Sequence, residues 1–231
     1  MDRIIGMIGG TGPQGQGLAL RWGLAGEQVI MGSRQQEKAD KIAAEVNAKL
    51  GQDLVIPRVN EKCVEEADIV LLTVPFEYAE ATLKPFLPLL SENKILVDVT
   101  VPLLVEKGKM VDVLPEDQVG APSATELFVK LAPDVPVVGA FKTLSNATLQ
   151  AIDELPTLDQ DVFIFGKNKE AKRIVKEKAA LIKNLRPVNA GNYRAGRHVE
   201  RFTAFVIGCN IRYKTHHSGM RITGLPDKDT F

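Results

Sequence analysis

The chain has 231 residues, which is enough for one large or two small domains with a buried core. Hydrophobic residues make up 45% and charged residues 25%, as in ordinary soluble globular proteins. Lysine plus arginine and aspartate plus glutamate both number 29, so the charge balance argues against a dedicated nucleic-acid-binding protein, which is usually strongly basic.

Cysteine and histidine are too few and too scattered to suggest a disulfide framework or a metal site. Cys63 and Cys209 stand far apart with no CxxC neighbour, which predicts free thiols in a reducing compartment. The three histidines lack the spacing of metal ligands, so no metal is expected. The first apolar run is short and interrupted by glycine, and no stretch reaches the length of a transmembrane helix. We therefore expect a cytoplasmic protein with no membrane partner.

Apolar runs of strand length alternate with stretches of helical periodicity. The runs are Ile4–Ile8, Val29–Met31, Leu54–Val59, Ile69–Val74, Ile95–Val101, Val135–Phe141 and Val162–Phe165. The helical stretches between them are Gly15–Ala25, Gln35–Leu50 and Glu77–Leu90. Continuous β-branched runs are typical of strands buried on both faces of a parallel sheet. Their alternation with helices predicts βαβ crossovers and an α/β fold with a Rossmann-type doubly wound parallel sheet.

The pattern changes around Asp159–Gly166. Beyond it we expect a helix over Lys169–Asn184, a short strand over Arg186–Ala190 and a helix over Arg194–Tyr213. The sequence therefore predicts a first domain over residues 1–166. A small, mostly helical C-terminal portion over residues 167–231 is expected to pack on it.

A glycine-rich loop follows the first strand directly. Gly10, Gly12 and Gly15 fill the pattern G-x-G-x-x-G and lead into a helix. In such a loop the first glycine makes the tight turn, the second lets the backbone approach a diphosphate, and the third lets helix and strand pack closely. The diphosphate is bound by free N–H groups at the helix N-terminus. A glycine turn without a ligand is the alternative, which the strand–loop–helix context disfavours.

The end of the second strand indicates which dinucleotide would bind. An NAD-selective site carries an acid there, to bond the ribose hydroxyls. This chain has Ser33 and Arg34 instead, with Lys38 one helical turn further on. A hydroxyl and two cations bind a 2′-phosphate that an acid would repel, so we expect NADP. The alternative is that the two cations belong to a solvated helix start.

Loops at the carboxyl ends of later strands are expected to complete the cleft. Thr73–Phe76 contains Pro75, and Val99–Pro102 ends in Pro102. Each proline stops a strand. Val74, Phe76 and Val101 would form an apolar wall beside a nicotinamide. Ordinary strand termination explains the same residues equally well.

At this point the chain resembles the NADPH-dependent F420 reductases. The resemblance covers nearly the whole chain and rests on the glycine loop, on Gly32-Ser33-Arg34 with Lys38, and on several later segments. These are Thr73-Val74-Pro75, Ala140–Ser145, Leu185-Arg186-Pro187, Arg212-Tyr213-Lys214 and Gly219–Leu225. The last is the most family-specific, because many reductases share the glycine loop.

The resemblance implies a homodimer that transfers hydride directly between NADP(H) and the deazaflavin coenzyme F420. The residues it implies at NADP, together with the glycine loop, are Gly10, Thr11, Gly12, Pro13, Gln14, Gly15, Ser33, Arg34, Lys38, Val74, Tyr78, Val101 and Asn146. Those expected at the second ligand are Lys142, Leu144, Ser218, Gly219 and Met220.

Lys142 departs from the family, which commonly has a histidine after the Ala-Phe or Ala-Leu pair. Lys142 and His217 are the candidates for stabilising charge on a reduced ring, and neither is assigned as essential. The departure leaves open an NADPH-dependent reductase of another acceptor, such as a flavin, a ferric chelate or an imine. A non-catalytic NADP-sensing module is the third possibility.

Basic residues predominate near the C-terminus. They are Arg186, Arg194, Arg197, Arg201, Arg212, Lys214 and Arg221, and Glu200 is the one acid among them in the sequence. Such a bias would favour a polyanionic second ligand, since clustered charge raises its local concentration. A solvated helix face with counterions is the alternative.

Overall fold

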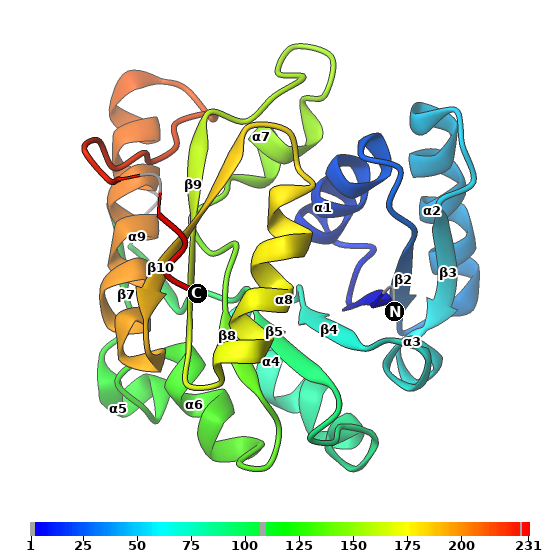
Figure 1. Cartoon of the computed structure of the whole chain (residues 1–231), viewed down its shortest axis with the longest axis horizontal. Helices are drawn as coiled ribbons and strands as arrows, with labels where there is room; N and C mark the ends of the chain where they lie inside the picture. Colours follow the sequence, from blue (N-terminus) through cyan, green and yellow to red (C-terminus); the bar gives the residue numbers. More distant parts are fainter. Residues whose placement is uncertain (1–2, 107–109, 227) are drawn as a thin grey trace.

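The computed structural model describes residues 3–106, 110–226 and 228–231. Its centre is an eight-stranded sheet in the order β10-β9-β8-β5-β4-β1-β2-β3 (Figure 1). The strands are β1 (Ile5–Ile8), β2 (Val29–Ser33), β3 (Val55–Val59), β4 (Ile69–Leu72), β5 (Ile95–Asp98), β8 (Val137–Gly139), β9 (Gln160–Gly166) and β10 (Leu185–Gly191). The six strands from β3 to β8 pair in parallel, β9 is antiparallel to β8, and β10 is parallel to β9. This is the expected doubly wound α/β fold.

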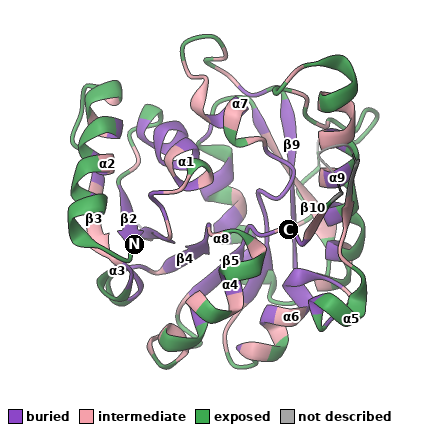
Figure 2. Ribbon diagram, turned by 180° about the vertical axis from the view of Figure 1, so that it is seen from behind, coloured by how far each residue is buried: buried purple, intermediate pink, exposed green. Residues whose placement is uncertain are grey.

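Helices cover both faces of the sheet, and buried strands separate them (Figure 2). One face packs on α1 (Pro13–Leu24), α2 (Gln36–Leu50), α7 (Asn146–Gln150) and α8 (Lys169–Ala180). The other packs on α3 (Asn60–Glu66), α4 (Phe76–Leu83), the 3-10 helix η1 (Lys84–Leu89) and α6 (Ala124–Leu131). Alternate residues of β1 show why both are needed, because Ile5 and Met7 enter one core and Ile8 the other.

The last long helix, α9 (Gly196–Tyr213), packs through Val199 on Phe163 and Phe165 of β9. A short hairpin of β6 (Leu103–Glu106) and β7 (Met110–Val113) lies against it. The remaining elements are α5 (Glu116–Val119) and the 3-10 helix η2 (Tyr193–Ala195). Because β10 pairs with β9, the sheet continues past residue 166. The division into 1–166 and 167–231 stays a prediction.

Several elements differ from the sequence prediction for local reasons. The helix expected over 77–90 ends at Leu83, since Pro85 and Pro88 cannot donate backbone hydrogen bonds, and η1 follows. The hairpin, α3 and α6 were not predicted. The start of α6 carries a recognisable signal: Ser123 Oγ accepts from Glu126 N at 3.2 Å, as in the S-x-x-E capping box.

Buried polar contacts attach α1 to its neighbours and so fix the glycine loop before it. Arg21 is 3% exposed and donates to the carbonyl oxygens of Thr148 (2.6 Å) and Leu149 (2.9 Å) in α7 and of Leu155 (2.6 Å) in the loop after it. Trp22 Nε1 donates to the Lys178 carbonyl at 2.8 Å. The carbonyls of Thr148, Leu149 and Lys178 are in the last turn of a helix, where carbonyls lack a partner within the helix.

Both cysteines are free thiols, as expected. Cys63 is buried under β1 and β2, and burial raises the pKa of its thiol to about 12. In the part of the chain that is described, no cluster of His, Cys, Asp and Glu could hold a metal ion. Across the same residues, no helix is both long and apolar enough to cross a membrane.

Candidate functional site: a two-ligand cleft

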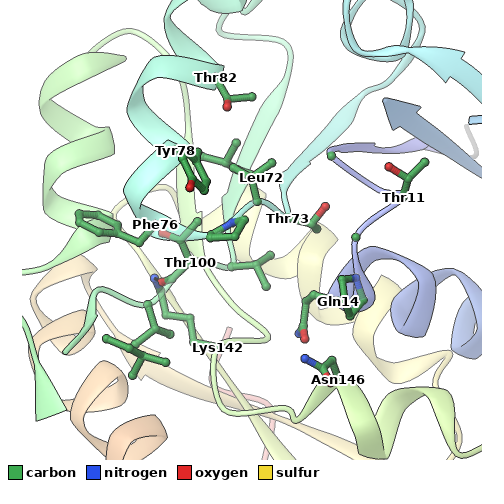
Figure 3. A pocket seen from close by; sticks show the side chains of 18 of the residues that line it. Thr11, Gln14, Leu72, Thr73, Phe76, Tyr78, Thr82, Thr100, Lys142 and Asn146 are labelled. Carbon is green, nitrogen blue, oxygen red and sulfur yellow. Dashed lines mark hydrogen bonds between the residues drawn. The ribbon is translucent and has the colours of Figure 1, made fainter. Parts of the chain in front are cut away.

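A cavity of about 1630 Å³ opens at the carboxyl ends of β1, β2, β4, β5 and β8. This edge includes the point where the strand order reverses, between β1 and β4, which is where doubly wound sheets bind ligands. Thr11 and Gln14 lie at one end, and Phe76 and Lys142 lie at the other (Figure 3). A drug-sized ligand occupies roughly 300–1,000 Å³, so the cavity has room for two ligands side by side.

The glycine loop wraps the first end of this cavity. Gly9 adopts the left-handed conformation (φ 73°), and a hydrogen bond from Gly12 N to the Gly9 carbonyl at 2.9 Å closes a tight turn that contains Gly10. Gly15 is required by space, because a Cβ there would stand 2.4 Å from the Gly10 carbonyl oxygen. Gly12 is the N-cap of α1 and makes no side-chain cap, so the first N–H groups of the helix face the cavity. This geometry fits a diphosphate.

Asn60 is a loop-holding residue that the sequence did not reveal. It is 5% exposed, lines the cavity from the start of α3, and its Oδ1 accepts from Gly9 N at 3.1 Å. Thr73 Oγ1 similarly donates to the Ile8 carbonyl at 2.9 Å. The two contacts hold the end of β1 and the turn after it, one from the start of α3 and the other from the end of β4. No sequence pattern identifies Asn60, because its partner lies 51 residues away.

Ser33, Arg34 and Lys38 line the same cavity beyond the glycine loop. Ser33 is buried at 3% exposure, whereas the Arg34 and Lys38 side chains are exposed at the rim. Among the described residues that line the cavity there is no aspartate or glutamate. The corner therefore combines a hydroxyl with two exposed cations and has no acid to repel a 2′-phosphate.

The other half of the cavity, called the acceptor half below, is largely apolar and is closed by α9. The predicted wall residues Val74, Phe76 and Val101 all line it, as do Tyr78, Leu144 and Asn146. From α9 come Thr203, Val206, Ile207 and Asn210. The structure thus brings the glycine loop and the apolar wall into one cleft.

Besides Gly10 and Gly15 of the glycine loop, four predicted residues do not line this cavity: His217, Ser218, Gly219 and Met220. Met220 packs instead against Phe163, Phe165 and Val199, and a Cβ at Gly219 would overlap Gln160. The exposed His217 has Nδ1 3.4 Å from Thr148 Oγ1. Their assignment to the second ligand therefore has no support from the geometry of a single chain, and it stays a prediction.

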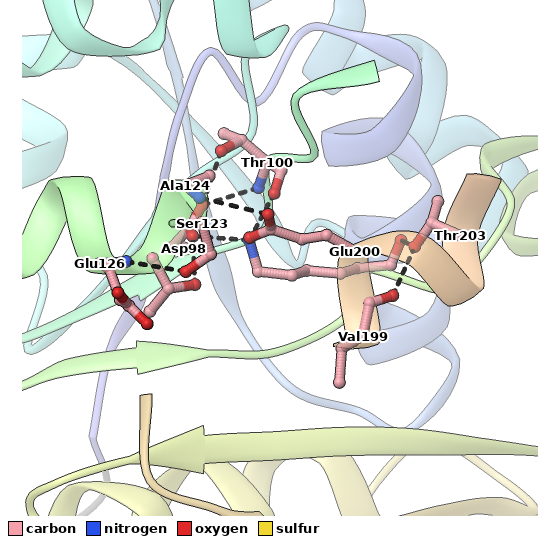
Figure 4. A network of polar contacts seen from close by, with 10 residues as sticks. Asp98, Thr100, Ser123, Ala124, Glu126, Val199, Glu200 and Thr203 are labelled. Atoms are coloured by element: carbon pink, nitrogen blue, oxygen red, sulfur yellow. Dashed lines mark hydrogen bonds and ion pairs between the residues drawn. The ribbon is translucent and has the colours of Figure 1, made fainter. Parts of the chain in front are cut away.

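Lys142 occupies the floor of the acceptor half and is fully buried. Its Nζ donates to Asp98 Oδ2 at 2.6 Å and to the Thr100 carbonyl, and it lies 3.2 Å from Glu200 Oε1. Asp98 Oδ1 accepts from Thr100 N at 2.9 Å and Thr100 Oγ1 at 2.8 Å. Figure 4 shows Glu200 and Thr203 of α9 facing Asp98 and Thr100. This network engages the ammonium of Lys142, and its expected contact with a ligand ring stays a prediction.

The basic residues of the C-terminal portion are mostly neutralised by acids from earlier in the chain. The pairs are Arg186 with Asp161, Arg197 with Glu126, Arg201 with Asp112, and Arg221 with Asp159. The bias seen in the sequence is thus largely balanced by tertiary contacts. It does not by itself indicate a polyanionic ligand.

Glu200→Gln should change how stability depends on pH. Burial raises the pKa of the Glu200 carboxyl above its ordinary value of 4.5; Asp98 acts in the same direction, while Lys142 and the Ala124 N–H oppose it. The folded protein therefore holds this proton more tightly than the unfolded chain. Its stabilising contribution is complete below pH 4.5 and is lost as pH rises through the folded-state pKa.

We expect the Tm of Glu200→Gln, relative to that of the wild type, to increase with pH across that window. Thermal unfolding from below pH 4.5 to mildly alkaline pH measures it. Glu177→Gln, whose side chain is 60% exposed on α8, is the matched control for the loss of a surface carboxylate. A flat or falling difference for Glu200→Gln would contradict the assigned direction.

Comparison with known proteins agrees with this geometry. Residues 4–102 match the family model described as NADP oxidoreductase coenzyme F420-dependent. The F420-dependent NADP reductase of Methanocaldococcus jannaschii is 35% identical over 227 residues, covering 96% of this chain and 98% of that protein. The enzyme of the same name from Methanothermobacter thermautotrophicus is 34% identical over 228 residues, with 97% of each chain covered. The chain belongs to the F420-dependent NADP reductase family.

Solved structures confirm the fold alone. A protein from Arthrobacter sp. FB24 superposes with a TM-score of 0.76 at 20% identity, covering 96% of this chain and 99% of that one. An imine reductase from Bacillus cereus gives a TM-score of 0.59 at 14% identity, covering 92% of this chain and 61% of the reductase. The F420-dependent NADP reductase family thus shares its dinucleotide fold with reductases of other acceptors.

Proposed function

We propose that this chain catalyses hydride transfer between NADP(H) and the deazaflavin coenzyme F420. The observation that carries the proposal is a single cavity that joins a diphosphate loop and a phosphate-binding corner to an apolar half large enough for a second ring. Membership of the F420-dependent NADP reductase family supports the identity of both ligands.

The residues of the chain bind the two ligands, orient them and exclude water from the space between them. The free N–H groups at the start of α1 hold the diphosphate, and Ser33, Arg34 and Lys38 hold the 2′-phosphate. When both ligands are bound, the nicotinamide and the deazaflavin exchange a hydride. Val74 and Val101 bring them together in an apolar space, where orientation supplies much of the rate. Among the residues that line the cavity, no acid or base is required for this role.

The quaternary structure and the compartment belong to the same proposal. Several large apolar side chains of α9 are exposed, with Phe205 at 67% and Tyr213 at 77%. A surface of this kind supports a homodimer formed through α9, which light scattering would detect as a doubled mass. A cytoplasmic location follows from the free thiols, because disulfides are rare there.

The direct test is to mix the pure protein with NADPH and F420 and to follow the visible absorbance of the oxidised deazaflavin. We expect the band to disappear at a rate proportional to enzyme concentration. Turnover of a flavin, a ferric chelate or an imine without turnover of F420 would favour an NADPH-dependent reductase of another acceptor. NADPH binding with no turnover of any acceptor would favour a sensing module.

A further inference from the structure

One residue connects the three walls of the acceptor half of the cavity. Lys142 lies between β8 and α7, its ammonium contacts Asp98 and Thr100 at the end of β5, and it also contacts Glu200 of α9. Its own carbonyl accepts from Thr203 Oγ1 at 3.0 Å, one turn further along α9. The helix is therefore attached to Lys142 at two successive turns, next to the residues with which it lines the cavity.

The ammonium itself is not presented to a ligand. Its side chain has 0% exposure, and three oxygen atoms surround it: Asp98 Oδ2, the Thr100 carbonyl and Glu200 Oε1. Asp98 Oδ2 and the Thr100 carbonyl accept hydrogen bonds from the ammonium, and Glu200 Oε1 lies 3.2 Å away as its ion-pair partner. A contact with an acceptor ring would require this network to open.

Each of the two carboxylate oxygens of Glu200 faces a different segment of the chain. Its Oε2 accepts from Ala124 N at the start of α6 at 3.2 Å. Within the described residues, Oε1 accepts no hydrogen bond and faces Lys142 Nζ as an ion pair. The carboxylate thus fixes α9 against α6 on one side and, by charge alone, against Lys142 on the other.

A buried ion pair is not the arrangement expected if this part of the core served stability alone. Burying an ion pair costs desolvation, and apolar side chains of similar volume often stabilise as well or better. Phe141, directly before Lys142, adopts a left-handed conformation (φ 58°) that is unfavourable for a bulky residue. Its ring packs on Trp22 with centroids 5.5 Å apart while the next residue enters the polar network. Strain and buried charge together indicate a functional reason for this geometry.

We propose that Lys142 and Glu200 are a positioning pair that holds α9 at a fixed spacing from the β5 loop, and so sets the width and alignment of the acceptor half of the cleft. The inference rests on the proposed function for the identity of the acceptor. Neither residue touches the acceptor, so both contribute through Thr203, Val206 and the other cavity residues of α9.

The first measurement uses the ligand-free protein. Hydrogen–deuterium exchange is compared for wild type, Lys142→Met and Glu200→Gln, at a pH above the Glu200 transition found by the stability comparison. We expect the amides of residues 203–210 to exchange about tenfold faster in both variants, while those of α2 are unchanged. Glu177→Gln is the control and should exchange as the wild type does. Unchanged exchange of α9 in both variants overturns the proposal, whatever the ligand.

The second measurement is the affinity for F420, followed by its absorbance or fluorescence, beside the affinity for NADP⁺. Both variants should bind F420 about tenfold more weakly, with the affinity for NADP⁺ unchanged, because the contacts of the pair are with the β5 loop, α6 and α9. A direct contact predicts a different pattern. If the ammonium bound the acceptor, Glu200→Gln would release it and leave F420 binding unchanged or stronger, which overturns the proposal.

A third variant separates positioning from stability. Lys142→Met combined with Glu200→Leu replaces the charges at both positions with apolar side chains, so it should regain Tm lost by Lys142→Met alone. It should not regain F420 affinity, because the attraction across the cleft is absent. Recovery of both quantities together overturns the proposal. Failure of the wild type to bind F420 counts against the proposed function alone, since the exchange measurement needs no ligand.

Discussion

Gly15→Ala should abolish NADPH-dependent turnover at ordinary cofactor concentrations. The added Cβ would lie 2.4 Å from the Gly10 carbonyl oxygen and 2.5 Å from its Cα, and neither backbone atom can rotate away. Relief requires α1 to move from the loop, which displaces the N–H groups that face the diphosphate. A misplacement of about 1 Å can cost roughly a hundredfold in rate, and overpacking costs about 3 kcal/mol of stability. Steady-state kinetics and urea unfolding measure the two effects.

The matched control is Gly208→Ala in α9. A Cβ at Gly208 meets nothing within 4 Å, and the residue is inside a helix, where alanine is favoured over glycine by about 1 kcal/mol. This variant should keep its affinity for NADPH and unfold at the same or a slightly higher urea concentration. NADPH kinetics for Gly15→Ala equal to those of Gly208→Ala would mean that the loop does not bind the diphosphate.

Arg34→Ala should raise the KM for NADPH by about tenfold to a hundredfold, because a hydrogen bond between charged groups contributes about 1.5–3 kcal/mol. The KM for NADH should change little, since NADH has no 2′-phosphate. The exposed guanidinium keeps its solvent when no cofactor is bound, so stability should also be unaffected. Comparing KM for the two cofactors in wild type and variant provides the test.

Lys41→Ala is the control for Arg34→Ala. Lys41 is an exposed cation on α2, the helix that begins two residues after Arg34, but it does not line the cavity. Lys41→Ala should leave the KM for NADPH and the KM for NADH unchanged. This control separates the loss of a contact with the phosphate from a general loss of positive charge. Equal increases for NADPH and NADH in Arg34→Ala would refute the assignment of the 2′-phosphate corner.

Local sequence determined the dinucleotide half of this protein. The glycine loop, Ser33, Arg34 and Lys38 all lie within 30 residues of one another, on the first two strands and the turns that follow them. Buried parallel strands are continuous apolar runs, so their order along the chain could be predicted directly. The left-handed backbone of Gly9 required the structure, because φ at one position cannot be deduced from a run of glycines.

Tertiary structure decided the acceptor half. Lys142 was expected beside the second ligand, yet it is enclosed by Asp98 and Glu200, which lie 44 and 58 residues away in the sequence. The direction of β9 and the hairpin before α5 likewise followed from pairing rather than from local pattern. A side chain's charge can be predicted from sequence, but the partner that neutralises it depends on which distant segments the fold brings together.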